Sequence, residues 1–503
     1  MFKKILIANR GEIAIRVARA CRELGICPVG IYSSADENSK HLRYMEETYL
    51  VGDPPPQSSY LNIQAIIDLA KASNADAIHP GYGFLAENPK FARACEDSGI
   101  IFIGPGSKAL ALVGDKVASR NTVTKVGVPI IPGMQIAKKG YASFKNIAAE
   151  VGYPVIVKAS MGGGGKGMRI VRTEKELQNS IEAGQREAKS AFGDETVYLE
   201  KYIERPRHIE FQVLRDKHGN TVHLFERECS IQRRHQKIVE ETPSTALDVD
   251  LRQRMGEAAK RVIEASDYTN AGTVEFLLDE THNFYFLEVN ARVQVEHPIT
   301  EMVTGIDLVR QQIMIAAGVE IGFQQDAVEQ RGHAIEARIY AEDPENGFLP
   351  SPGKILYLDE PNGPGVRIDS GIFQGWDVPP HYDPILSKLI AWAEDRESAI
   401  NRMSDALSYY VILGIKTNLG YLRRIMLTPK FTAGDYHTHF IDDNEADLRM
   451  SDDSIHAAIT AASLIAMTGR NGERILRQED EILRSTTPWH EIGDWEVCRD
   501  IHE

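Results

Sequence analysis

The sequence has few cysteines, no long apolar run and no surplus of basic residues, and each shortage excludes a class of protein. Its five cysteines lack Cys-x-x-Cys spacing, which argues against a disulfide framework or a structural zinc site. No stretch approaches the ~18 uninterrupted apolar residues of a membrane-spanning helix. The apolar run near the N-terminus is also far shorter than the roughly 7–15 residues of a secretory signal core. We therefore expect a cytoplasmic protein without a membrane segment.

Acidic side chains outnumber basic ones by 72 to 57, and the net charge is −15. This balance argues against nucleic-acid binding through bulk positive charge. Residues 441–503 hold 15 acidic and 6 basic side chains, so this tail carries −9 of the total. The rest of the chain is close to neutral, and its Arg and Lys clusters can serve small anions. We expect the tail to dock on a partner subunit or on the body of the protein.

A length of 503 residues suggests about three domains. Residues 1–114 alternate aliphatic strands with amphipathic helices, which is typical of a doubly wound parallel sheet. A second α/β section follows, and a β-rich section with dense Pro-Gly turns begins near residue 331. The dinucleotide pattern Gly-x-Gly-x-x-Gly is absent from the first turn, which disfavours nicotinamide binding. Strands are predicted at 3–8, 27–32, 76–79 and 100–103, and helices at 11–24, 61–71, 89–98, 396–410, 418–427 and 454–467.

A glycine-rich segment follows a predicted strand that ends at Lys158. Consecutive glycines lose much conformational entropy on ordering, so a site that brings backbone N–H groups against phosphate gives a reason for them. The segment does not match the P-loop pattern, which excludes a P-loop NTPase. The alternative is a flexible surface linker. The residues of this glycine-rich segment are Gly162, Gly163, Gly164, Gly165 and Lys166.

A predicted hairpin joins residues 273–278 to a strand that begins at residue 284. Because strand side chains alternate between faces, Glu288, Asn290 and Arg292 should point the same way. Gln294 and Glu296 join them if the extended backbone continues. With Glu275 across the hairpin, the carboxylates and the amide offer hard oxygen ligands that suit Mg²⁺ or Mn²⁺ rather than zinc. The alternative is an ordinary strand with a solvated polar face.

A basic run over residues 227–237 includes His235 and Lys237. Such a run is most often a solvated loop, but beside a metal-phosphate site it becomes a candidate anion clamp. Lone histidines such as His79 and His208 are weak signals without that context.

Further motifs follow one another in order over most of the chain. They are IANRGEIAIR (7–16), HPGYGFLAEN (79–88), FIGP (102–105), GDK (114–116), ERECSIQRRHQK (226–237), EVNARVQVEHPITE (288–301), RGHAIEARIYAEDP (331–344), FLPSPG (348–353), HYDPI (381–385) and GIKTN (414–418). With the glycine-rich loop, this series resembles biotin carboxylase, the ATP-grasp subunit of biotin-dependent carboxylases, over residues 1 to about 445.

The resemblance implies an α/β protein of three domains. These are a Rossmann-like N-terminal domain (1–114), an ATP-grasp domain (115–330) with a mobile lid at about 132–203, and a β-rich C-terminal domain (331–445). Residues 446–503 are left as an acidic extension of unknown role.

The resemblance also assigns roles to residues. ATP would be held by Lys116, Lys158, the glycine-rich loop with Lys166, Glu200, Lys201, Ile203, His208, His235 and Leu277. The metal ions would be bound by Glu275, Glu288 and Asn290. Bicarbonate would be surrounded by Lys237, Arg292, Gln294, the backbone of Val295, and Glu296, and biotin would face Arg338.

The implied reaction begins with Glu296 as a general base toward bicarbonate. Bicarbonate then attacks the γ-phosphate of ATP, and the resulting carboxyphosphate carboxylates biotin while Arg338 stabilises the biotin enolate. The chain has no Met-Lys-Met carrier tripeptide, so biotin would come on a separate carrier protein, with a carboxyltransferase on another subunit. The family suggests a homodimer. The carboxyl acceptor, whether pyruvate or an acyl-CoA, is not identified.

Two alternatives remain open. Another ATP-grasp ligase would share the nucleotide and metal residues but would give no purpose to the basic run or to Arg338. A nucleotide-sensing module without catalysis would not need Glu296, Arg292 and Lys237 together.

Overall fold

The computed structural model describes residues 1–133, 141–159, 168–192, 195–450 and 460. Its contacts divide the chain into Met1–Leu448 and Arg449–Glu503, and the fold below is that of the first unit. The glycine-rich segment from Gly162 to Lys166 and most of the acidic tail, with its predicted helix, lie outside the described residues.

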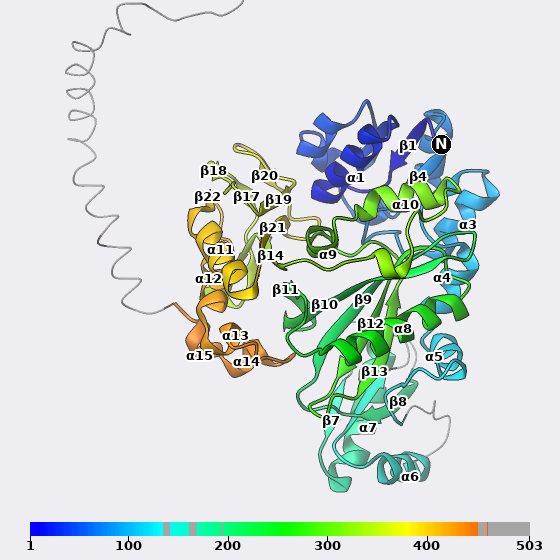
Figure 1. Cartoon of the computed structure of the whole chain (residues 1–503), viewed down its shortest axis with the longest axis vertical. Helices are drawn as coiled ribbons and strands as arrows, with labels where there is room; N and C mark the ends of the chain where they lie inside the picture. Colours follow the sequence, from blue (N-terminus) through cyan, green and yellow to red (C-terminus); the bar gives the residue numbers. More distant parts are fainter. Residues whose placement is uncertain (134–140, 160–167, 193–194, 451–459, 461–503) are drawn as a thin grey trace, which may run out of the picture. The chain divides into compact units, whose positions relative to one another are not determined.

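The N-terminal section is a five-stranded parallel sheet in the order β3-β2-β1-β4-β5. This confirms the predicted doubly wound arrangement (Figure 1). Edge strand β3 was missed because exposed and half-buried residues alternate along most of it. The elements are β1 (Lys4–Ile7), α1 (Gly11–Glu23), β2 (Cys27–Ser33), β3 (Glu47–Gly52), α2 (Ile63–Ala72), β4 (Ala77–His79), α3 (Pro89–Asp97) and β5 (Ile101–Phe102), followed by α4 (Ser107–Gly114) and α5 (Lys116–Lys125).

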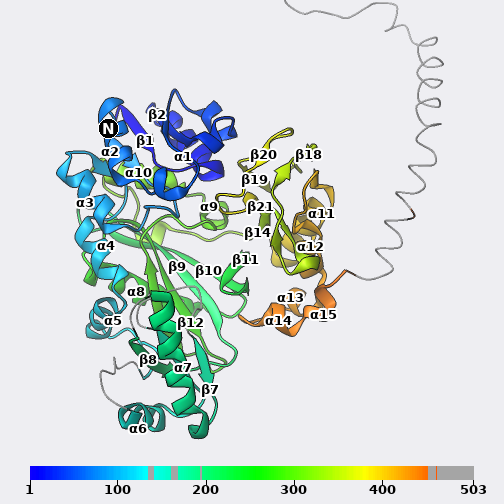
Figure 2. The same ribbon diagram turned by 180° about the vertical axis from the view of Figure 1, so that it is seen from behind.

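A small sheet within residues 141–201 has its own apolar core. Strands β7 and β8 both pair antiparallel with β6, which ends one residue after Lys158. Helix α7 packs along β6 and β7 (Figure 2). The elements are α6 (Tyr141–Val151), β6 (Val155–Ala159), β7 (Arg169–Val171), α7 (Glu174–Phe192) and β8 (Val197–Lys201).

An eight-stranded antiparallel sheet connects the central and C-terminal sections in the order β13-β12-β9-β10-β11-β14-β21-β19. The sheet therefore continues across the boundary predicted at residues 330 and 331. Its strands are β9 (Arg207–Arg215), β10 (Thr221–Arg233), β11 (Gln236–Thr242), β12 (Asn270–Leu278), β13 (Phe284–Asn290), β14 (His333–Tyr340), β19 (Val366–Ser370) and β21 (Ile385–Ala393).

Helices cover this sheet and complete the C-terminal core. The predicted helices near residues 396 and 418 are confirmed. The helices are α8 (Val249–Ala265), α9 (His297–Thr304), α10 (Leu308–Ala316), α11 (Arg396–Tyr409), α12 (Leu419–Leu427), α13 (Pro429–Thr432), α14 (Phe440–Asp443) and α15 (Glu445–Leu448). Short strands complete the section: β15 (Glu342–Asp343), β16 (Leu349–Pro350), β17 (Gly353–Lys354), β18 (Tyr357–Asp359), β20 (Asp377–Val378) and β22 (Val411–Leu413). Within the described residues, no helix combines the length and apolar character needed to cross a bilayer.

Candidate active site

The hairpin of β12 and β13 places three oxygen-bearing side chains on one face. Glu275 and Glu288 are direct cross-strand partners, so their side chains project to the same side. Asn290 lies two residues after Glu288 and shares that face. Glu275 is buried, whereas Glu288 is exposed. The predicted hairpin and the shared face of Glu275, Glu288 and Asn290 are confirmed.

The extended backbone does not continue to Glu296, so the condition under which Gln294 and Glu296 would share that face is not met. Strand β13 ends at Asn290, and Glu296 directly precedes α9. The chain turns here because the N–H of Ala291 donates to the Glu87 carboxylate at 2.8 Å and Val293 packs into the core. A loop and a helix start, rather than a strand, therefore position Gln294 and Glu296.

Arg292 nevertheless lies beside Gln294. Its Nη1 donates to Gln294 Oε1 at 2.8 Å, and its Nη2 donates to Asn290 Oδ1 at 3.3 Å. Its Nε donates to the Glu87 carboxylate at 3.1 Å. The guanidinium is only partly buried, so it can bind a planar anion.

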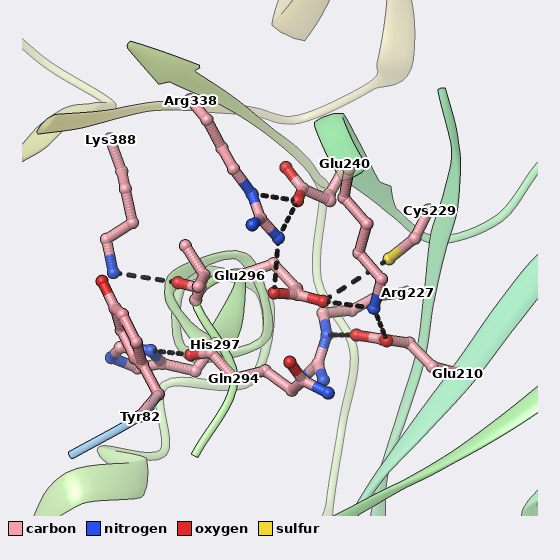
Figure 3. A network of polar contacts seen from close by, with 12 residues as sticks. Tyr82, Glu210, Arg227, Cys229, Glu240, Gln294, Glu296, His297, Arg338 and Lys388 are labelled. Atoms are coloured by element: carbon pink, nitrogen blue, oxygen red, sulfur yellow. Dashed lines mark hydrogen bonds and ion pairs between the residues drawn. The ribbon is translucent and has the colours of Figure 1, made fainter. Parts of the chain in front are cut away.

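Glu296 is completely buried between two cations (Figure 3). Its carboxylate accepts from Lys237 Nζ at 2.7 Å and from Arg338 Nη2 at 2.9 Å. Burial alone would raise the pKa of Glu296, but the charges of Lys237, Arg338 and Arg227 outweigh it and hold the pKa well below its usual value. Glu296 is therefore ionised at neutral pH and can accept a proton.

Lys237 in β11 connects Glu296 to the hairpin. Its ammonium donates to Glu210 at 2.5 Å and to Glu275 at 2.8 Å, as well as to Glu296. Fully buried Arg227 in turn fixes Glu210, with an ion pair of 2.5 Å. The basic run thus contributes its two ends to the site, which favours the clamp interpretation over a solvated loop.

Arg338 in β14 lies between two carboxylates (Figure 3). Its Nη2 is 2.5 Å from Glu240 Oε1 and 2.9 Å from Glu296 Oε2. Burial raises the pKa of Glu240 to about 7; Arg338 opposes this, while the charge of Glu296 adds to it. Two carboxylates on one guanidinium therefore differ in proton affinity.

A cavity of about 200 Å³ opens beside the outer hairpin strand. Lys116 at the start of α5 lines it together with Glu87, Glu288 and Asn290. The GDK motif thus lies next to the exposed carboxylate of Glu288. The Lys116 ammonium could pair with a triphosphate there, and the Glu288 carboxylate could bind its cation.

The other predicted nucleotide residues within the described part of the chain lie in β6, β8, β9 and β12 and in the turns after β8 and β10. Lys158 in β6 pairs with the buried Glu200 of β8 at 2.6 Å, and Arg120 pairs with the same carboxylate. Lys201 Nζ donates to the carbonyl oxygens of Gly152 and Tyr153, so its side chain ties β8 to the preceding turn.

His208, Leu277 and His235 lie toward the hairpin. His208 Nε2 is 3.0 Å from Glu275, whose charge raises the pKa of this histidine although burial alone would lower it. Leu277 and His208 are direct cross-strand partners. His235 lies in the tight turn after β10, with positive φ, and Ile203 follows the end of β8.

Glu275, Glu288 and Asn290 fit a hard divalent cation, because two carboxylates and an amide oxygen project from one face of the hairpin. Like charges directly opposite each other on a hairpin are unfavourable without a cation between them. In this structure Lys237 and His208 supply positive charge to Glu275.

Comparisons with known proteins identify the family. Family models match residues 1–110 (biotin carboxylase, N-terminal domain), 115–323 (carbamoyl-phosphate synthase L chain, ATP binding domain) and 336–443 (biotin carboxylase C-terminal domain). One of the subunits of pyruvate carboxylase from Methanothermobacter thermautotrophicus is 55% identical over 443 residues, which are 88% of this chain and 90% of that protein. The chain belongs to the biotin carboxylase family.

Two further biotin carboxylases support the same conclusion. That of a Nostoc strain is 52% identical over 88% of this chain and 99% of its own. The biotin carboxylase domain dimer of Hydrogenobacter thermophilus 2-oxoglutarate carboxylase, solved with magnesium ADP and bicarbonate, has a TM-score of 0.85 and 48% identity. The match covers 90% of this chain and 100% of that one. The carbamoyl-phosphate model covers the ATP-binding section alone, and the flanking domains distinguish a biotin carboxylase from another ATP-grasp ligase.

Glu210 and Glu240 beside the site were missed in the sequence, and Arg227 was named only as part of the basic run. All three are charged residues in strands that are largely buried, where charged side chains are rare unless they are paired. Glu87 was present in the HPGYGFLAEN motif, but nothing local indicates that it contacts Arg292 more than 200 positions later.

Proposed function

We propose that this chain carboxylates biotin with bicarbonate and ATP through carboxyphosphate. The single observation that carries the proposal is the fully buried, ionised Glu296 held by Lys237 and Arg338, next to a loop that presents Arg292 and Gln294. A buried carboxylate with two cations is costly to assemble, and its use as a proton acceptor gives a reason for it.

Bicarbonate binds against Arg292, Gln294, Lys237 and the backbone of Val295. Glu296 takes its proton, and the freed oxygen attacks the γ-phosphate. Lys237 touches both Glu296 and Glu275, so it spans the bicarbonate and nucleotide ends and can neutralise charge as the phosphoryl group is transferred.

ATP binds over the hairpin. Lys116, Lys158 and His208 supply positive charge to its phosphates, Glu200 holds Lys158, and Lys201, Ile203, His235 and Leu277 complete the nucleotide site. Glu275, Glu288 and Asn290 hold Mg²⁺, or Mn²⁺, which when bound screens the charge of the triphosphate. The glycine-rich segment with Lys166 lies outside the described residues, and its role at the phosphates stays a prediction.

Carboxyphosphate breaks down to CO₂ and phosphate, and this phosphate removes the N1′ proton of biotin. Arg338 faces biotin and stabilises the oxygen of its enolate until N1′ attacks CO₂. Biotin arrives on a separate carrier protein, and a carboxyltransferase subunit receives the carboxyl group. The chain works as a homodimer. The carboxyl acceptor is not specified by this site, and the cytoplasmic location and the domain boundaries stay predictions.

Bicarbonate-dependent ATP hydrolysis stimulated by free biotin is the test. We expect ADP release to require bicarbonate and to rise with biotin. Hydrolysis indifferent to both would contradict the proposal and would favour another ATP-grasp ligase. No hydrolysis despite nucleotide binding would favour a sensor.

A further inference from the structure

Lys388 in β21 is a completely buried lysine that the reaction described above does not use. Its ammonium donates to the carbonyl oxygen of Val295 at 2.9 Å. Figure 3 shows it reaching toward the loop that carries Gln294 and Glu296, from the side opposite to Glu210. A lysine from the C-terminal section thus contacts the backbone of the bicarbonate loop.

The surroundings of Lys388 keep it charged. Its Nζ is 3.3 Å from Glu12 and 3.7 Å from Asp369. Burial alone would lower the pKa of Lys388, but Glu12, Glu336 and Asp369 outweigh this and leave it above the usual value. Hydrogen bonds from charged donors are stronger than those from neutral donors, so the Lys388 ammonium forms a strong hydrogen bond with the Val295 carbonyl oxygen.

The N-terminal section holds the other side of Lys388. Glu12 on α1 accepts a hydrogen bond from the Tyr82 hydroxyl, and the Lys388 ammonium lies 5.9 Å from the centre of the Tyr82 ring. Lys388 therefore joins α1 and β21 to the loop before α9, and a shift between these segments would move Val295.

The loop is fixed at the neighbouring carbonyl groups as well. His297 Nδ1 lies 2.7 Å from the Gln294 carbonyl oxygen, and Arg292 Nη1 donates to that of Val293 at 3.3 Å. The carbonyl of Val295 belongs to the peptide plane that leads into Glu296, so its orientation sets the starting direction of the Glu296 side chain.

We propose that Lys388 is a positioning residue for bicarbonate: through the Val295 carbonyl, it holds the backbone of the bicarbonate loop and the Glu296 carboxylate in the geometry that binds the anion and accepts its proton. The inference rests on the proposed function. It adds to the site a residue of the C-terminal section, Lys388, that contacts neither substrate. It predicts that a substitution of Lys388 raises the KM for bicarbonate and leaves nucleotide affinity unchanged.

Lys388→Met tests the proposal, because methionine has a similar length and no donor. We expect the KM for bicarbonate to rise by about tenfold, which corresponds to the loss of one charge-assisted hydrogen bond. The KM for ATP and the affinity for ADP should stay within about twofold. A merely structural role would instead lower the melting temperature without separating the two substrates.

Glu12→Gln is the matched control. It removes a carboxylate charge beside Lys388 but keeps an oxygen acceptor for Tyr82 and leaves the contact with Val295. We expect a lower melting temperature with the bicarbonate KM within about twofold of the wild type. Equal rises of this KM in both variants would overturn the proposal, since the ion-pair network and not the carbonyl contact would then set the geometry.

If Lys388→Met does not fold, Lys388→Gln is the variant that tests the proposal. Its amide nitrogen is one atom nearer to the backbone than Nζ, so the contact with Val295 is lost here too, and the bicarbonate KM should rise. An unchanged bicarbonate KM in whichever variant folds overturns the proposal. Failure of the wild type to hydrolyse ATP in response to bicarbonate would instead overturn the proposed function.

Discussion

The two ends of the site handle charge in opposite ways. At the proposed bicarbonate end, Glu296 is fully buried and contacts Lys237 and Arg338, so its charge is neutralised before any ligand binds. At the proposed nucleotide end, Glu288 is exposed beside a cavity and lies directly across the hairpin from Glu275, a like charge. The protein alone neutralises Glu296, whereas at the second end Lys237 and His208 pair with Glu275 and, in the proposed function, Glu288 is left for a cation.

The difference suits the two tasks. A base must keep its geometry and its ionised state throughout turnover, and a low-dielectric network of fixed charges provides both. A nucleotide site must admit and release a highly charged ligand in every cycle, which a fully neutralised pocket would hinder. Variants at each end should therefore fail differently.

The largest effect is expected for Glu296→Gln. The amide keeps the size of the side chain but accepts no proton, so bicarbonate-dependent turnover should fall by roughly 10²- to 10⁴-fold. The affinity for ADP, measured by calorimetry, should change by less than about twofold. If Glu296→Gln kept turnover near the wild-type level, Glu296 would not be the proton acceptor, and the proposed difference between the two ends would be wrong.

Glu288→Gln should change the metal requirement at the nucleotide end. Removing one charged ligand should raise the Mg²⁺ concentration for half-maximal activity on the order of tenfold. Because Glu288 makes no described contact with Glu296 or Arg338, the bicarbonate KM at saturating Mg²⁺ should stay within about twofold. A rise in the bicarbonate KM without a change in the Mg²⁺ requirement would contradict the assignment of Glu288 to the nucleotide end.

Glu240→Gln should flatten the pH dependence of stability. The pKa of Glu240 is raised to about 7 in the folded protein, so its stabilising contribution is complete below its unfolded value of about 4.5 and is lost as the pH rises through 7. In Glu240→Gln, the free energy of unfolding should lack this decline, which amounts to up to about 3 kcal/mol between pH 5 and 8.

Neighbouring Glu241 provides the control of opposite sign. Hydrogen bonds and charges from His333 and Arg396 lower the pKa of Glu241 to about 2 against the effect of burial. Its contribution is present above about pH 4.5 and is lost as the pH falls toward 2. Glu241→Gln should therefore destabilise the protein at pH 7 and leave the slope between pH 5 and 8 unchanged. A change of that slope would contradict the assignment to Glu240.

The smallest effect on catalysis is expected for a chain that ends at Leu448. The described fold of Met1–Leu448 contains both ends of the site, so ATP hydrolysis with bicarbonate and free biotin should stay within about twofold of the full chain. If the acidic tail docks a partner, recovery of the carrier protein by co-purification should fall. A large loss of hydrolysis would mean that the tail supports the site itself.

The sequence predicted what is local. The alternation in β13 identified Glu288 and Asn290, and the cross-strand position of Glu275 followed from one hairpin. The alternation does not extend to Glu296, because the chain turns after Asn290, where Glu87 from the N-terminal section accepts a hydrogen bond from the Ala291 N–H.

Contacts between distant segments could not be predicted from spacing. Glu240 and Arg338 meet because β11 and β14 are neighbours in the eight-stranded sheet, although 98 positions separate them. Lys388 reaches Val295 over 93 positions. In a single sequence, nothing near these residues indicates their partners. The sheet order brings Glu240 to Arg338, and the loop before α9 brings Val295 to Lys388.

A crystal structure with magnesium ADP and bicarbonate tests the central claim most directly. The account predicts bicarbonate bound to the Arg292 guanidinium, with one of its oxygens about 3 Å from the Glu296 carboxylate. Bicarbonate bound elsewhere, with Arg292 still on Glu87 and Glu296 out of reach of the anion, would contradict it.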